Sequence, residues 1–155
     1  MKNLQFDAII EKAIASEEEA KLFYLNLAEK VTDKATQDTL LYLAAEEGKH
    51  KEYLLRYRRD NFISEAGNAE QAAGDKIAAF LAPPEVNYNM DSKDVYLLAA
   101  ARELKSYNFY QAMAGLHPAG EIKKMLLKMA SEELKHKEKV EYLYSNTAFA
   151  QTAGG

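Results

Sequence analysis

Apolar residues recur at every third or fourth position along four long stretches of the chain, which is the period of an amphipathic α-helix. The stretches cover residues 4–31, 34–59, 92–116 and 119–144. The chain as a whole contains only seven Gly and three Pro residues and is rich in Ala, Leu, Glu and Lys, which favour helix. The pattern therefore predicts four long helices and an all-α fold.

Short connections join the first predicted helix to the second and the third to the fourth. Thr32 and Asp33 offer a side-chain cap between the first and second helices, and residues 91–94 offer one at the start of the third. His117 and Pro118 end the third helix, and Pro118 is expected at the first position of the fourth. Connections this short make the joined helices antiparallel neighbours, so the sequence predicts two helix hairpins.

The segment between the hairpins differs from the rest, because residues 60–91 carry Gly67, Gly74, Pro83 and Pro84. A short helix is expected over residues 69–81. If both hairpins hold their inward polar residues at one height, the second and third helices run in the same direction, and this segment returns the chain along the bundle. The prediction is a four-helix bundle with a long crossover over residues 1–144, followed by a flexible tail over residues 145–155.

Each predicted helix places a carboxylate on its apolar face. A Glu-x-x-His motif occurs in the second helix and again 86 residues later in the fourth, and each copy has a Glu 30 residues upstream. The two sets are Glu17, Glu47 and His50, and Glu103, Glu133 and His136. Residues 44–52 also align with residues 130–138, so the two halves of the chain look like a duplication.

Folding at the predicted turns brings the carboxylates level with one another. Glu17 lies 14 residues before residue 31, and Glu47 lies 13 residues after residue 34. Glu103 and Glu133 stand in nearly the same relation to the second turn. All six side chains are therefore expected near the middle of the bundle, on the inward faces of its helices.

Four inward carboxylates need compensating charge, because a buried carboxylate without a partner is costly and normally takes up a proton. Two divalent cations would balance them, with two neutral imidazoles completing the ligand shell. Oxygen and nitrogen ligands without sulfur suit iron or manganese, and zinc is also compatible. A single Glu-x-x-His motif is usually a solvated pair, so the prediction of six metal ligands depends on the matched second copy.

Three further polar side chains near these motifs allow more than one interpretation. Tyr24 and Tyr110 each lie seven residues after a predicted ligand, on the same helix face. As candidate catalytic residues they would hydrogen-bond the carboxylates of the opposite hairpin, and the alternative is packing in the core. His117, at a helix end before Pro118, is expected at the surface.

Composition excludes several classes of protein. The net charge of −4 offers no basic field for a nucleic acid. The chain has no Cys, which excludes disulfides, thiolate chemistry and a Cys-ligated iron centre within it. The first residues contain no long apolar stretch of the kind found in a signal peptide or membrane span, so a cytoplasmic protein without a membrane partner is expected.

The doubled motif resembles the ferritin-like superfamily and, within it, the rubrerythrin-like di-iron proteins, over about residues 4–144. The resemblance implies a ferritin-like bundle with a carboxylate-bridged, non-haem di-iron centre. In that pattern Glu47 and Glu133 bridge the irons, and Glu17 and Glu103, each with one His, are terminal ligands. Two features differ from rubrerythrins: the chain lacks their Fe(Cys)4 domain, and Ser106 stands where peroxidase members carry an extra Glu.

The resemblance implies an oxidoreductase that reduces hydrogen peroxide or dioxygen under oxidative stress, with electrons from an external rubredoxin-like or flavoprotein donor. The alternative is a ferroxidase or an iron-binding or storage protein without peroxidase turnover, which the number of irons per chain would separate. A third interpretation is a structural or interaction bundle with a vestigial site, for which chelation would leave the melting temperature unchanged. Ten Tyr and six Phe residues lead us to expect a homodimer.

Overall fold

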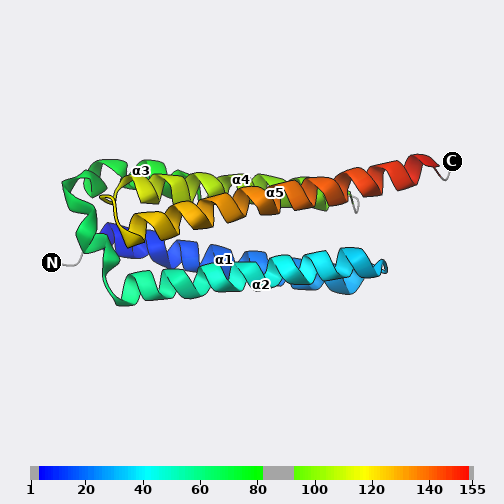
Figure 1. Cartoon of the computed structure of the whole chain (residues 1–155), viewed down its shortest axis with the longest axis horizontal. Coiled ribbons are helices and arrows are strands. Elements are labelled where there is room, and N and C mark those ends of the chain that lie inside the picture. The colour runs from blue at the N-terminus through cyan, green and yellow to red at the C-terminus, as the bar shows by residue number, and fades with distance from the viewer. Residues whose placement is uncertain (1–3, 82–92, 154–155) are drawn as a thin grey trace.

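The computed structural model describes residues 4–81 and 93–153, and the side chains of residues 5–66, 74–81 and 93–147. Its regular elements in these ranges are all helical: α1 (Leu4–Lys30), α2 (Lys34–Arg59), the 3-10 helix η1 (Phe62–Ala69), α3 (Glu70–Ala79), α4 (Asp94–Gly115) and α5 (Glu121–Ala153). The long helices pack as two hairpins, α1 with α2 and α4 with α5 (Figure 1). The predicted all-α bundle of two antiparallel hairpins is confirmed.

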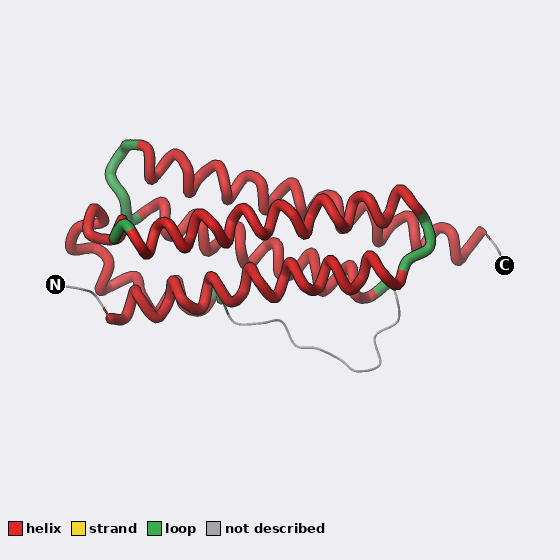
Figure 2. Tube along the Cα trace, turned by 90° about the horizontal axis from the view of Figure 1, so that it is seen from below, coloured by secondary structure: helices red, strands yellow, loops and turns green. Residues whose placement is uncertain are grey.

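The directions of the helices also agree with the sequence. In Figure 1, α1 and α5 run one way along the bundle, and α2 and α4 run the other way. The crossover begins with η1 and α3 at the end of the bundle where α2 finishes, and α3 contacts α1 and α4 (Figures 1 and 2). The expected short helix over residues 69–81 corresponds to α3, while residues 82–92 lie outside the described residues.

The turn within each hairpin has a local cause. Asp33 caps α2 as predicted, because its carboxylate accepts hydrogen bonds from the backbone N–H of Thr36 at 2.9 Å and from the Thr36 hydroxyl at 2.7 Å. The expected position of Pro118 is wrong, since α5 begins only at Glu121. The carbonyl of Gly120 accepts the first helical bond from Lys124, at 3.0 Å, so Pro118 lies within the turn of residues 116–120.

The ends of α4 and α5 differ from the predicted boundaries. At the start of α4, Lys93 is the N-cap residue without a side-chain cap, and residues 91–92 lie outside the described residues. The helix predicted to end near residue 144 continues to Ala153, beyond the ends of the other three long helices (Figure 1). Residues 145–153 contain no Gly or Pro and include three Ala, so nothing in them ends the helix where a flexible tail was expected.

The core consists of two apolar clusters with a polar layer between them. Along α2, Leu40 and Leu43 belong to the first cluster and Leu54 and Tyr57 to the second. We call the first the turn cluster; it also contains Tyr24, Ala28, Ala44, Tyr96, Ala99, Ala100, Val140 and Leu143. The second, the crossover cluster, includes Phe6, Ile10, Ile77, Phe109, Met113, Leu126 and Met129. Two apolar layers therefore enclose the polar layer in the middle of the bundle.

Candidate metal centre

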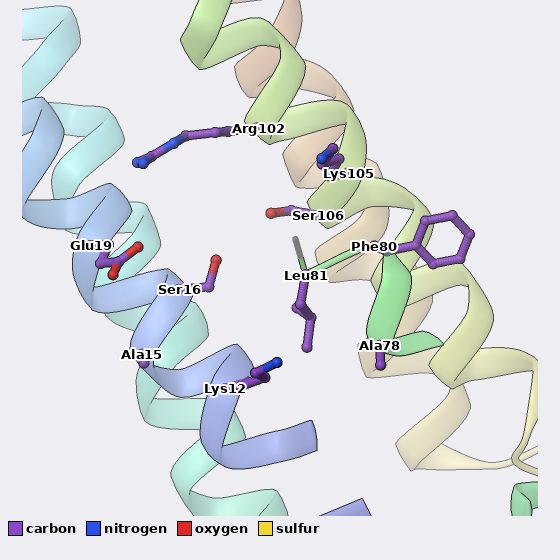
Figure 3. Close-up of a pocket in the computed structure, with 10 residues that line it drawn as sticks. All are labelled: Lys12, Ala15, Ser16, Glu19, Ala78, Phe80, Leu81, Arg102, Lys105 and Ser106. Atoms are coloured by element: carbon purple, nitrogen blue, oxygen red, sulfur yellow. The ribbon is translucent and has the colours of Figure 1, made fainter. Parts of the chain in front are cut away.

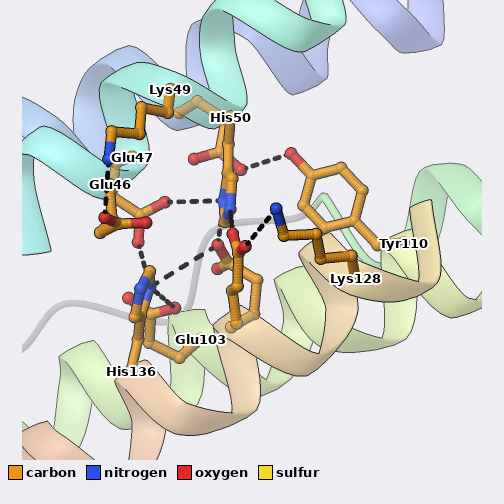
Figure 4. A network of polar contacts seen from close by, with 11 residues as sticks. Glu46, Glu47, Lys49, His50, Glu103, Tyr110, Lys128 and His136 are labelled. Atoms are coloured by element: carbon orange, nitrogen blue, oxygen red, sulfur yellow. Dashed lines mark hydrogen bonds and ion pairs between the residues drawn. The ribbon is translucent and has the colours of Figure 1, made fainter. Parts of the chain in front are cut away.

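Six buried polar side chains lie between the turn cluster and the crossover cluster, and Figure 4 shows four of them, Glu47, His50, Glu103 and His136, turned towards one another. Each of the four long helices contributes, and each side chain exposes 4% or less of its surface. The six residues are the ones singled out by the doubled motif: Glu17 from α1, Glu47 and His50 from α2, Glu103 from α4, and Glu133 and His136 from α5. The structure thus brings together every residue that the sequence predicted as a metal ligand.

The six side chains form two overlapping groups suited to two cations. In the first group, one ligand atom from each of Glu17, Glu47, His50 and Glu133 lies within 4.8 Å of the others. In the second group, the same holds for Glu47, Glu103, Glu133 and His136. Glu47 and Glu133 belong to both groups. This sharing is the arrangement expected of bridging carboxylates between two metal ions.

Both imidazoles turn the same ring nitrogen towards the carboxylates. Nδ1 of His50 contacts Oε1 of Glu133 and lies 3.8 Å from Oε2 of Glu47. Nδ1 of His136 lies 3.1 Å from Oε1 of Glu47, 3.6 Å from Oε2 of Glu103 and 3.8 Å from Oε1 of Glu133. The two rings stack at 5.8 Å between centroids. Each imidazole therefore belongs to one group, and its Nδ1 faces the carboxylates.

The terminal carboxylates each divide their two oxygens between a tyrosine and the centre of the site. Tyr110 donates a hydrogen bond to Oε1 of Glu17 at 2.7 Å, and Tyr24 donates one to Oε1 of Glu103 at 2.6 Å. Oε2 of Glu17 and Oε2 of Glu103 are buried without a protein hydrogen-bond partner. Each tyrosine comes from the opposite hairpin, so these are the hydrogen bonds that the sequence allowed as one of two alternatives.

Further polar atoms in the site also lack a protein partner. They are Nδ1 of His50, whose ion-pair contact with Glu133 lacks hydrogen-bond geometry, and Oε1 of Glu133 itself. Buried polar atoms normally have partners, so these unpaired atoms within the two groups are available to bind cations. With the two free carboxylate oxygens, the donor set is oxygen and nitrogen only, which fits iron or manganese ions.

The pKa shifts of the buried carboxyl groups also favour the binding of positive charge in the cluster. Burial, followed by the neighbouring charges of Glu103, Glu133 and Glu17, raises the pKa of Glu47 well above its usual value. Burial and the charges of Glu103 and Glu17 raise the pKa of Glu133 in the same way. The raised pKa values favour the protonated forms of these two carboxyl groups, and a bound cation would compete with the protons.

A seventh polar residue at the site was missed by the sequence analysis. Nε2 of His50 lies 2.7 Å from Oε2 of Glu132, which is partly exposed on α5. The hydrogen bond to His50 lowers the pKa of Glu132. Glu132 directly precedes a ligand in the chain, and the sequence pattern did not single it out. The available signal was the known preference of metal-binding imidazoles for a carboxylate on their second nitrogen.

The surface position predicted for His117 is wrong. His117 exposes only 3% of its surface, and its Nε2 lies 2.7 Å from the hydroxyl of Tyr57, which belongs to the crossover cluster. Burial lowers the pKa of His117, so the ring is held neutral there. A helix end is usually solvated, but here the α4–α5 turn packs against the last turns of α2. His117 contacts none of the six candidate ligands in the described contacts.

A small cavity beside the cluster shares three lining residues with a larger cavity between α1 and α4. The inner cavity, about 20 Å³, is lined by Glu47, Glu103 and Glu133 and holds no more than a water-sized molecule. The outer cavity, about 360 Å³, opens between α1 and α4 (Figure 3). Ser16, Arg102 and Ser106 line both. Ser106 thus lies beside both the outer cavity and the cavity next to the carboxylates.

The fold and this site define a four-helix bundle with a buried carboxylate and histidine cluster of the di-metal type. In comparison with protein families, the model of the rubrerythrin family matches residues 8–144, and the chain belongs to this family. No match was found among curated proteins or among solved structures. Within the described ranges, none of the helices is long and apolar enough to cross a membrane.

Proposed function

We propose that the protein is a non-haem di-iron oxidoreductase that reduces hydrogen peroxide, or dioxygen, with electrons from an external donor. The observation that carries the proposal is the pair of overlapping ligand groups that share Glu47 and Glu133. Two divalent cations balance the charge of four carboxylates, which are otherwise too costly to bury together. Membership of the rubrerythrin family supports iron as the metal.

Bound iron would supply the redox chemistry, since two ferrous ions together provide the two electrons that, with two protons from solvent, convert one hydrogen peroxide to two waters. The chain's own residues supply position and surroundings. Glu17 and Glu103 are each held by a tyrosine through Oε1, which leaves Oε2 for a metal. Burial and the neighbouring carboxylates raise the pKa values of Tyr24 and Tyr110 well above the usual value of a tyrosine. Both hydroxyls therefore keep the proton that they donate.

The small volume of the cavity beside the cluster favours a small oxidant as the substrate. The inner cavity of about 20 Å³ excludes organic substrates, whereas hydrogen peroxide and dioxygen are close to water in size. The apolar clusters above and below exclude other water from the site. We therefore propose that only small oxidants reach the carboxylates, through the space that Ser16, Arg102 and Ser106 line.

Rapid mixing of the anaerobic, ferrous protein with hydrogen peroxide tests this proposal. We expect the absorption band of an oxo-bridged di-iron centre to appear rapidly after mixing. About one peroxide should be consumed per two irons. Glu133→Gln should abolish the band, and the exposed Glu138→Gln on the same helix should leave it unchanged. If the wild type binds two irons and peroxide produces no such band, the oxidoreductase proposal is wrong.

One observation favours a second candidate, a ferroxidase or iron-binding protein without peroxidase turnover. Ser106 replaces the extra carboxylate of the peroxidase members of the family, and it leaves a hydroxyl beside the inner cavity. A ferroxidase would oxidise ferrous iron faster with dioxygen than with peroxide and would accumulate many irons per chain. A peroxidase would hold two irons per chain and react faster with peroxide. The two rates and the iron content decide between them.

A further inference from the structure

The two candidate cation positions are related by the duplication, but they differ outside the ligands. An offset of 86 residues pairs His50 with His136. The same offset pairs Glu46 with Glu132, the residues that directly precede the bridging carboxylates. In a symmetric centre each of these outer carboxylates would support the histidine of the opposite hairpin. Only one of them does so here.

On the His50 side, two charged side chains, Glu132 and Lys128, link the imidazole to the surface. Nε2 of His50 lies 2.7 Å from Oε2 of Glu132, and Nζ of Lys128 lies 3.9 Å from Oε1 of the same carboxylate. Glu132 is intermediate in exposure, with 27% of its side chain accessible, while His50 is buried. Figure 4 shows Lys128 reaching from α5 towards this chain of contacts.

On the His136 side, the equivalent carboxylate is turned elsewhere. Glu46 pairs with Lys49 on its own helix, where Nζ lies 3.2 Å from Oε1 (Figure 4). The described polar contacts of His136 all run through Nδ1, to Glu47, Glu103 and Glu133. An aromatic ring lies near its imidazole instead: Tyr42 stands edge-on, with 6.3 Å between the ring centroids. Tyr42 occupies the repeat position of Lys128.

This difference has a direct consequence for metal binding. A carboxylate that accepts a hydrogen bond from Nε2–H fixes the tautomer that leaves the lone pair on Nδ1, holds the ring in place and makes Nδ1 a stronger donor. His50 has this support and His136 does not. We propose that Glu132 is a positioning residue that makes the position beside His50 the tighter cation site, so that the centre fills in two unequal steps.

The inference rests on the proposed function, in that the cluster must bind divalent cations at all. Metal-free full-length protein titrated with Co²⁺ without oxygen tests it, followed by the visible ligand-field bands of the bound ion and by competition with a chelator. We expect two steps in the wild type, with different spectra for the first and second equivalents. Glu132→Ala should lower the first association constant by about 10- to 100-fold and bring the two steps together.

Glu46→Ala is the matched control, because it removes the same charge from the repeat-equivalent position. It should leave both association constants and the one-equivalent spectrum unchanged. Glu132→Gln keeps an acceptor oxygen for Nε2–H without the charge and should recover part of the lost affinity. Because Glu132 is partly exposed, all three metal-free variants should melt like the wild type; if the Ala variant does not, the Gln variant carries the comparison.

The possible results separate the inference from the proposed function. No Co²⁺ binding by the wild type contradicts the proposed function itself. Two bound Co²⁺ ions with equal affinities in the wild type overturn the inference and leave the proposed function standing. The same holds if Glu132→Ala binds like the wild type, or if Glu46→Ala loses as much affinity as Glu132→Ala, because the effect would then be one of charge alone.

Discussion

At the scale of single residues, the two tyrosines determine how the terminal carboxylates are presented. The seven-residue spacing from Glu17 to Tyr24 was compatible with core packing or with hydrogen bonding, and the structure shows both. Tyr24 and Tyr110 expose 2% and 0% of their surface, and both hydroxyls donate to a carboxylate of the other hairpin. Sequence could not decide the matter, because the partner of each hydroxyl lies on a helix distant in the chain.

Removing either hydroxyl should weaken the site without unfolding the protein. Tyr24→Phe and Tyr110→Phe each leave a buried carboxylate oxygen without its donor, so metal affinity should fall by about 10- to 100-fold. Competition with a chelator measures the affinity. Tyr142→Phe, at a side chain that is 65% exposed, is the control and should bind like the wild type. Wild-type affinity in both buried variants would show that the tyrosines serve packing alone.

The pair of Tyr57 and His117 should act on stability and not on metal binding. Tyr57→Phe leaves Nε2 of the buried His117 without its partner, which should cost about 1–3 kcal/mol of unfolding free energy. Urea denaturation measures this loss, and metal affinity should stay the same. A loss below the error of the measurement would mean that a water replaces the hydroxyl and that the buried contact contributes nothing.

At the scale of elements, apolar spacing predicted which parts of the chain are helical. Capping residues and prolines did not always predict where those helices begin and end. The predicted range of α2 agrees with the structure, where Asp33, one of the two residues offered as a cap, accepts the bond from Thr36 at the start of the helix. Pro118 and the end of α5 were misjudged. A proline is compatible with several turn positions, and the weak polarity of residues 145–153 does not stop a helix that is already anchored by the buried Val140 and Leu143.

The inward stripe of α2 yields a paired test of the turn cluster. Leu40 is fully buried, whereas its neighbour Leu41 is 46% exposed. Leu40→Ala should lower the unfolding free energy of the metal-free protein by about 2–5 kcal/mol, through lost burial and the cavity left behind. Leu41→Ala should change it by no more than about 0.5 kcal/mol. Equal losses in urea denaturation would contradict the assignment of the inward face.

At the scale of the whole molecule, the duplication made the site predictable and also concealed its asymmetry. Matched spacing identified six candidate ligands at one height, because two equal hairpins place equal positions opposite one another. The same symmetry predicts equal surroundings for the two histidines. The structure departs from it at Glu46 and Glu132. Glu46 pairs with Lys49 on its own helix, whereas Glu132 contacts His50 of the other hairpin.

The carboxylate cluster should give the metal-free protein an unusual dependence on pH. The pKa values of Glu47 and Glu133 are raised above the usual 4.5, so between that value and their folded values the native state binds more protons than the unfolded chain. Stability therefore falls as pH rises through this window. Cations replace these protons and remove the penalty, so the stabilisation by bound metal should grow with pH.

Melting temperatures of metal-free and metal-loaded protein, compared from about pH 5 to about pH 7.5, measure this effect. We expect the difference between the two forms to widen steadily. Taking the difference also cancels the contribution of His117, which is present in both forms and changes stability in the opposite sense. A difference that stays constant or narrows would mean that the carboxylates are not neutralised by protons in the metal-free state.

The most direct test of the di-metal centre is a crystal structure of protein purified without oxygen in the presence of iron, with anomalous diffraction measured at the iron edge. We predict two anomalous peaks in the middle of the bundle, both in contact with Glu47 and Glu133, one beside His50 and the other beside His136. A single peak, or none, with the four carboxylates protonated or bonded to one another, would contradict the di-metal centre on which the proposed function depends.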